Sequence, residues 1–180
     1  MTRTANLAFL IGPNSGEEYS LSGLEILKAE EWRIREQWFD GSVTLRIGDV
    51  RLECEGTPLL DFALALRYSV NLLAADGAAV MHLADGPAVR LGVESGAVQA
   101  RIGDAGVIGV CDFIDLAHAS SVFTRDLVDA IVEKRPEFLL SDAIERVYRE
   151  SGVRELSRER FLIHTQMMRT RSEMIRNDHA

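Results

Sequence analysis

Cysteine, lysine and long apolar runs are all scarce in this chain of 180 residues. Its two cysteines, Cys54 and Cys111, stand far apart and belong to no CxxC pair or Cys/His cluster, so the spacing of a disulfide scaffold or a zinc module is missing. The apolar run Leu7–Ile11 has five residues, too few for a signal-peptide core or a membrane span. We therefore expect a cytoplasmic protein without a membrane segment, in which both thiols are reduced and buried.

Lysine supplies only two of the 20 basic residues, and the other 18 are arginine. Codons rich in G and C give this bias, so we expect a high-GC bacterial source. The 28 acidic residues outnumber the bases and give a net charge of −8. A chain this acidic repels phosphate backbones unless its bases are clustered. The composition therefore disfavours nucleic acid as a partner and favours another protein with a basic surface.

A first block of strands is predicted over about residues 32–55. A strand through Trp32 and Trp38 would place both indoles on one apolar face, and Asp40-Gly41 after it is a strong hairpin signal. Two further segments in this block alternate apolar and polar residues. Three strands joined by two tight turns form an antiparallel meander that is apolar on one face and charged on the other.

An apolar helix is predicted over about 58–75, and a second block of short strands over about 79–111. The string Arg-Ile-Gly-Asp occurs at 46–49 and again at 101–104, each time at the end of a predicted strand. One interpretation is that the same turn sequence occurs twice without a common origin. The other is a duplicated β unit, which the flanking residues do not favour.

The remainder of the chain has helical periodicity. Helices are predicted over about 113–150, interrupted at Pro136, and a third follows within residues 153–180. The fold class is therefore α+β: an antiparallel meander of about seven strands, one helix between the two strand blocks, and a three-helix C-terminal segment. Two parts are expected, an acidic α+β domain over 1–152 and a C-terminal helix rich in arginine and methionine over 153–180.

Charge separates these two parts. Residues 153–180 hold six arginines and four acids and so carry +2, which leaves −10 on the first 152 residues. The C-terminal helix either packs on its own domain or serves as an arm, and an arm could form a homodimer. A helix-turn-helix over 140–165, with Arg154 and Arg158 near the start of its second helix, gives an alternative in which the chain is a DNA-binding regulator. The bulky ring of Tyr148, where two such helices must cross closely, argues against it.

One set of polar residues could carry chemistry. Asp115 and His118 are three residues apart on one predicted helix face, and with His82 they could form a two-histidine, one-carboxylate metal site. This alternative makes the chain a metal-dependent enzyme. The simpler interpretation is that Asp112 caps the helix, Asp115 is a first-turn acid and His118 is an ordinary surface residue.

Signals for other catalysis are weak. The sequence has no Gly-x-Ser-x-Gly, and neither cysteine has a neighbouring cue for a lowered pKa. We therefore predict no catalytic residue, cofactor or metal, and leave enzymatic activity open.

The residues predicted to form a partner surface fall into three groups. Aromatic side chains are enriched at binding hot spots, acidic side chains complement a basic partner, and methionine adapts to varied surfaces. Core packing is the competing interpretation for the aromatic and methionine residues, and a solvated sheet face is that for the acids. The groups are Trp32 and Trp38; Glu53 and Glu55; and Phe161, Met167, Met168 and Met174.

In its size, its acidity and its lack of catalytic motifs, the chain resembles the immunity proteins of polymorphic toxins. This resemblance implies an inhibitor that covers a basic toxin surface. The leading hypothesis is a non-catalytic cytoplasmic protein-binding module of the immunity type or an accessory protein, acting by surface complementarity.

Overall fold

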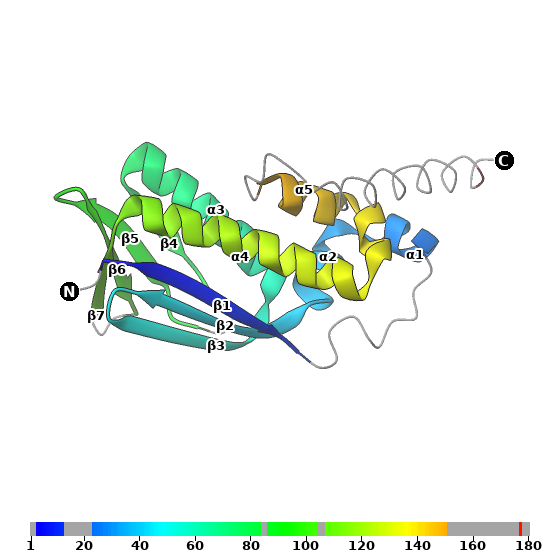
Figure 1. Ribbon diagram of the computed structural model, residues 1–180, viewed down its shortest axis with the longest axis horizontal. Helices are drawn as coiled ribbons and strands as arrows, with labels where there is room; N and C mark the ends of the chain where they lie inside the picture. Colours follow the sequence, from blue (N-terminus) through cyan, green and yellow to red (C-terminus); the bar gives the residue numbers. More distant parts are fainter. Residues whose placement is uncertain (1–2, 13–22, 84–85, 104–106, 151–176, 178–180) are drawn as a thin grey trace.

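The computed structural model describes residues 3–12, 23–83, 86–103, 107–150 and Asn177. Its strands form two antiparallel sheets (Figure 1). The first sheet has the order β1-β2-β3, with β1 (Ala5–Ile11), β2 (Asp40–Ile47) and β3 (Val50–Pro58). The second has the order β4-β5-β6-β7, with β4 (Ala78–Met81), β5 (Val89–Glu94), β6 (Ala97–Ile102) and β7 (Val107–Cys111).

The helices lie on one side of these sheets and at one end of the molecule (Figure 1). They are α1 (Gly23–Lys28), α2 (Glu31–Gln37), α3 (Leu59–Asp76), α4 (Phe113–Lys134), the 3-10 helix η1 (Pro136–Leu140) and α5 (Asp142–Glu150). The predicted α+β class is confirmed, with α3 between the two strand blocks and helices after β7. The predicted third C-terminal helix lies outside the described residues. No helix in the described ranges is long and apolar enough to cross a membrane.

The two long helices form the layer that covers the sheets. Helix α3 is capped at its C-terminus by Gly77, whose φ of +73° places it in the left-handed region and whose N–H donates to the Leu73 carbonyl at 3.1 Å. Helix α3 packs mainly over β4 and β5, whereas α4 packs over β1. Phe123 of α4 joins the layers, because its ring makes edge-to-face contacts with Phe9 of β1 and Phe62 of α3, each at 5.4 Å.

Residues 32–38 are a helix, so the predicted strand through the two tryptophans is wrong. Within α2, Ile34 is buried, and Trp38, four residues later at the C-cap, is buried beside it on the inner side. Even spacing in so short a segment fits this helical i, i+4 pair as well as a strand. The hairpin predicted at Asp40-Gly41 is also wrong, since both residues open β2. Gly41 is needed for close packing, because a Cβ there would stand 2.1 Å from the Leu10 carbonyl oxygen.

The two Arg-Ile-Gly-Asp strings occupy equivalent places in the fold. The Gly48 N–H donates to the Thr4 carbonyl at 2.8 Å, and the Gly103 N–H donates to the Ala88 carbonyl at 3.0 Å. Each acceptor immediately precedes a strand, β1 or β5, and both glycines have a positive φ. A three-stranded meander and a helix therefore occur twice, as β1-β2-β3-α3 and as β5-β6-β7-α4. This arrangement favours the duplicated unit over a turn that was merely used twice.

The first residues of α3 and α4 support this duplication. Helix α3 begins Leu-Leu-Asp-Phe-Ala and α4 begins Phe-Ile-Asp-Leu-Ala. Each helix starts within a few residues of the third strand of its own unit. Helix α4 then packs on β1 of the other unit, whereas α3 packs mainly on β4, which belongs to the second sheet but to neither unit. The two sheets are therefore joined through the long helices.

Candidate functional site

The outward face of the three-stranded sheet combines acidic, basic and apolar side chains. Strand pairing places them in rows that cross the sheet: Asn6, Arg46 and Arg51 in one row, and Ala8, Thr44 and Glu53 in the next. The third row contains Leu10 and Ser42. Because side chains alternate between the two faces of a strand, this set is turned away from the helices that cover the other face. We call these residues, together with Glu55, the β1–β3 face.

A β-bulge shapes the acidic end of this face. Pairing changes register between Gly41 and Val43, so that Glu55 and Gly56 of β3 both lie opposite Ser42 of β2. Gly56 has a φ of +60°, and a Cβ there would meet nothing within 4 Å. Bulges bend an edge strand and change the aim of its side chains. Here the bulge contains Glu55, the second of the two predicted acids of β3, and follows Glu53 by one residue.

The two acids differ in their partners. Glu53 forms an ion pair with Arg51 on the same strand, and both side chains are more than 60% exposed, so the pair contributes little to stability. Glu55 is exposed, and among the described residues no hydrogen bond or ion pair engages its side chain. A cationic group of a partner would therefore meet an unengaged carboxylate at Glu55.

Leu10 supplies the apolar part of the β1–β3 face. Its side chain is 70% exposed, whereas Leu7 and Phe9 on the same strand are partly buried and pack against the core. Between Leu10 and the acids lie Ala8, Ser42 and Thr44, whose side chains are short. Sequence reasoning missed Leu10, because the unbroken apolar run Leu7–Ile11 does not reveal which residues face outward until the register with β2 is known.

The two tryptophans are separated, and only one reaches the surface. Trp38 is 4% exposed, and its ring meets that of Phe138 edge to face at 5.7 Å, so it belongs to the core and is wrong as a partner-surface residue. Trp32 lies on α2 with 46% of its surface exposed, and its Nε1–H donates to Glu30. Phe161, Met167, Met168 and Met174, predicted to share the partner surface, lie outside the described residues, as do Arg154 and Arg158 of the DNA-binding alternative.

His82, Asp115 and His118 do not form a metal site in the structure. Within the described ranges, no group of three or more His, Cys, Asp or Glu side chains is placed to hold a metal ion. His82 is exposed just after β4, and His118 is exposed on α4. Asp112 is the N-cap residue of α4, as predicted, but its side chain makes no capping hydrogen bond.

Both cysteines are in the thiol form at neutral pH. Burial raises the pKa of Cys111 to about 11, with smaller contributions from the negative charges of Asp115 and Asp112. Burial also raises the pKa of Cys54. Because the thiolate is the nucleophilic form of cysteine, these environments oppose nucleophilic chemistry at either residue.

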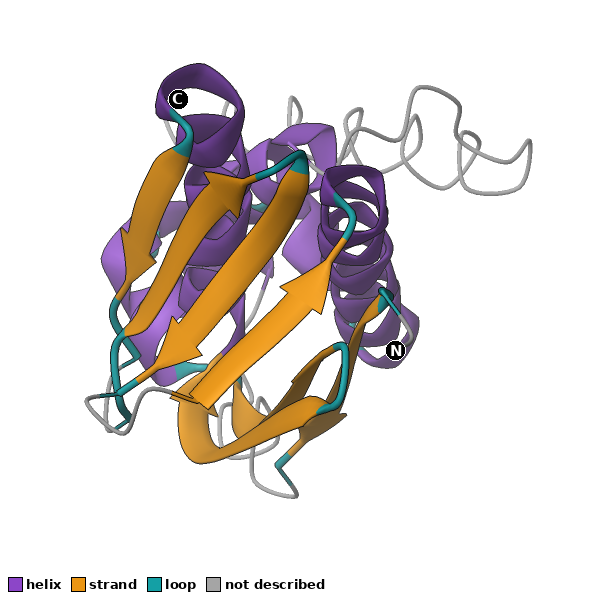
Figure 2. Cartoon of the chain, turned by 90° about the vertical axis from the view of Figure 1, so that its left-hand side faces the viewer, coloured by secondary structure: helices purple, strands orange, loops and turns teal. Residues whose placement is uncertain are grey.

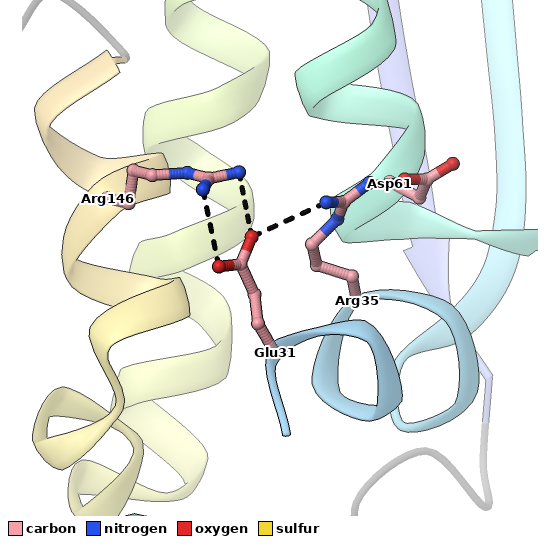
Figure 3. A network of polar contacts seen from close by, with 4 residues as sticks. All are labelled: Glu31, Arg35, Asp61 and Arg146. Carbon is pink, nitrogen blue, oxygen red and sulfur yellow. Dashed lines mark hydrogen bonds and ion pairs between the residues drawn. The ribbon is translucent and has the colours of Figure 1, made fainter. Parts of the chain in front are cut away.

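A second polar cluster lies at the helical end, between α2, α3 and α5 (Figure 3). The carboxylate of Glu31 accepts from Arg35 at 3.4 Å and from Arg146 at 2.7 and 3.2 Å, while Arg35 also pairs with Asp61. Burial lowers the pKa of Arg35, but the bonds and charges of Asp61 and Glu31 outweigh it, so that the pKa is raised. Two cations and two anions balance, and the cluster ties three helices together.

Comparisons with known proteins leave the site to be judged on this geometry alone. No protein-family model matches the chain, and neither the curated proteins nor the solved structures yielded a match.

Proposed function

We propose that the chain is a non-catalytic protein-binding module whose partner docks a basic surface on the β1–β3 face. The observation that carries the proposal is the juxtaposition of the highly exposed Leu10 with the unengaged carboxylate of Glu55, across the short side chains of Ala8, Ser42 and Thr44. An apolar anchor next to a charged group is the arrangement by which protein interfaces combine affinity with orientation.

An immunity-type inhibitor would use this surface to cover a cationic region of its toxin and exclude the substrate. The net charge of −8 would steer such a partner toward the domain, and Glu53 and Glu55 would fix its orientation on contact. The association rate should therefore fall as the salt concentration rises.

The test compares two variants of equal charge in a pull-down from the source organism. Glu53→Lys with Glu55→Lys changes the β1–β3 face, while Glu36→Lys with Glu133→Lys changes exposed acids on α2 and α4. Either pair moves the net charge from −8 to −4, since each Glu→Lys exchange adds two positive charges. We expect one stoichiometric partner to be retained by the unmodified chain and the control, and lost from the E53K/E55K variant.

Two results would contradict the proposal. One is equal retention of the partner by both variants. The other is the absence of any stoichiometric partner from the unmodified chain. A Leu10→Asp variant provides a second probe of the same face, because it introduces a charge at the apolar anchor while leaving both glutamates in place.

A further inference from the structure

The four-stranded sheet has an outward face of a different chemistry. Figure 2 shows this sheet toward the viewer with the helices behind it. Strand pairing aligns four outward residues, one from each strand, in a single row: Val80, Arg90, Arg101 and Ile108. All four are exposed, and Val80 and Ile108 are among the most exposed large apolar residues of the described chain, at 49% and 46%.

The two arginines are direct neighbours across β5 and β6. Opposed residues of an antiparallel pair have Cβ atoms roughly 4.5–5.5 Å apart, and like charges at such positions destabilise the sheet. Glu94 approaches Arg101 at 3.8 Å, with both side chains more than half exposed. That distance is about 1 Å longer than a charge-assisted hydrogen bond. A carboxylate brought by a ligand could therefore make a closer contact with Arg101 than Glu94 does.

The adjacent row leaves room for a ligand to approach the backbone. It consists of Ala78, Gly92, Gln99 and Val110, again one residue from each strand. A Cβ at Gly92 would meet nothing within 4 Å. A chain lying along the arginine row would thus meet the small residues Ala78 and Gly92 beside it on β4 and β5, with an apolar contact at each end of the arginine row.

We infer that this face docks an acidic segment of a partner protein, which places two carboxylates on Arg90 and Arg101 and apolar side chains on Val80 and Ile108. Four strands spaced by about 4.8 Å make a row of roughly 14 Å, which a segment of about five extended residues can span. This surface is separate from the β1–β3 face, and its charge has the opposite sign.

A peptide fits this face better than a nucleic acid. Two arginines neutralise only two phosphates, while Glu94 beside them and the net charge of −8 repel a polyanion. Val80 and Ile108 match aliphatic side chains, which a phosphate backbone lacks. The inference therefore commits to an acidic, aliphatic protein segment.

The experiment selects ligands from a displayed library of random twelve-residue peptides with the full chain as bait. We expect enrichment of peptides with two acidic residues flanked by aliphatic ones. Their affinity, measured by fluorescence anisotropy, should fall at least tenfold in an Arg90→Glu, Arg101→Glu variant. An Arg46→Glu, Arg51→Glu variant is the matched control, because it makes the same charge change at a cross-strand arginine pair on the outward face of the other sheet. Its affinity should stay within twofold.

If the double Glu variant fails to fold, Arg90→Gln with Arg101→Gln replaces it, with the same tenfold loss expected. Enriched peptides that bind the variants as tightly as the unmodified chain overturn the inference. So does tighter binding of single-stranded DNA than of peptide, or salt-sensitive self-association that the arginine variant abolishes. A variant with Glu53→Lys and Glu55→Lys should bind the selected peptides at least as well as the unmodified chain does. This result would show that peptide binding here does not depend on the β1–β3 face of the proposed function.

Discussion

Gly109 of β7 lies directly against Ile47 of β2, so that a Cβ on the glycine would stand 2.4 Å from the Ile47 carbonyl oxygen and 3.1 Å from the Ile47 Cβ. The two sheets approach each other here, and nearby the N–H of Asp112 donates to the Arg3 carbonyl at 3.1 Å. Only a residue without a side chain allows this contact, because the first obstacle is backbone and cannot rotate away.

Gly109→Ala is therefore expected to destabilise the fold by about 2 kcal/mol or more, in the upper part of the range for overpacking. Gly92→Ala is the control, since a Cβ at that strand position meets open space. It should be neutral or stabilising by up to about 1 kcal/mol. Urea unfolding of both variants measures the difference. Equal stabilities would show that the sheets do not meet closely at Gly109.

Trp38 and Trp32 should respond very differently to truncation. Trp38→Ala removes a buried ring that packs on Phe138, and should reduce the free energy of unfolding by about 3–5 kcal/mol. Trp32→Ala removes a half-exposed ring, and the loss should stay below about 1 kcal/mol. In fluorescence, Trp32→Phe should leave a blue-shifted emission that iodide quenches poorly. A strongly quenched, red-shifted emission would contradict the burial of Trp38.

Stability should fall at alkaline pH because of Cys111. Its folded-state pKa is about 11 against an ordinary value of 9.0, so the folded state retains the thiol proton where the unfolded chain has lost it. The stabilisation is therefore fully present below about pH 9 and is lost as the pH rises toward 11, by at most about 3 kcal/mol. Denaturant titrations at pH 8 and pH 10.5 should show a smaller decrease for Cys111→Ala. An identical decrease in the two proteins would exclude Cys111 as its source.

Glu31 should contribute modestly to stability through its two arginines. Its neighbours are 26–42% exposed, so Glu31→Gln should lower the free energy of unfolding by about 1 kcal/mol, and less at high salt. Glu36→Gln, on the same helix with an exposed side chain, is the control and should change it by less than about 0.5 kcal/mol. Thermal melts at low and high salt give the comparison, and a salt-independent effect of Glu31→Gln would speak against the ion pairs.

The strands and helices that are long enough to repeat their pattern of apolar and polar residues could be predicted from the sequence, whereas the short segments could not. Strands β4 to β7 and helix α3 match the predicted ranges 79–111 and 58–75 closely, and α4 begins at the predicted residue 113. Each of these elements has apolar residues at one period and a glycine or proline near its ends. In α2, seven residues were too few to separate period 2 from i, i+4 spacing. At Gly41 the sequence shows a glycine but not the Leu10 carbonyl that requires it.

The candidate site was predictable only where it depends on residue type. Glu53 and Glu55 stand out as charges in an alternating strand, and the structure places both on the outward face. Leu10, Val80 and Ile108 look like core residues in a sequence, and only strand register turns them outward. The pairing of Arg90 with Arg101 likewise depends on a hairpin register that composition does not contain.

The packing of α4 determines which pieces of the chain can exist alone. A polypeptide that contained only the four-stranded sheet and α4 would lack β1, the strand on which α4 mainly packs. The edge-to-face contact between Phe123 and Phe9 would be lost with that strand. We therefore expect that cutting the chain between its two strand blocks leaves apolar surface of α4 in water, so that neither fragment is stable without the other.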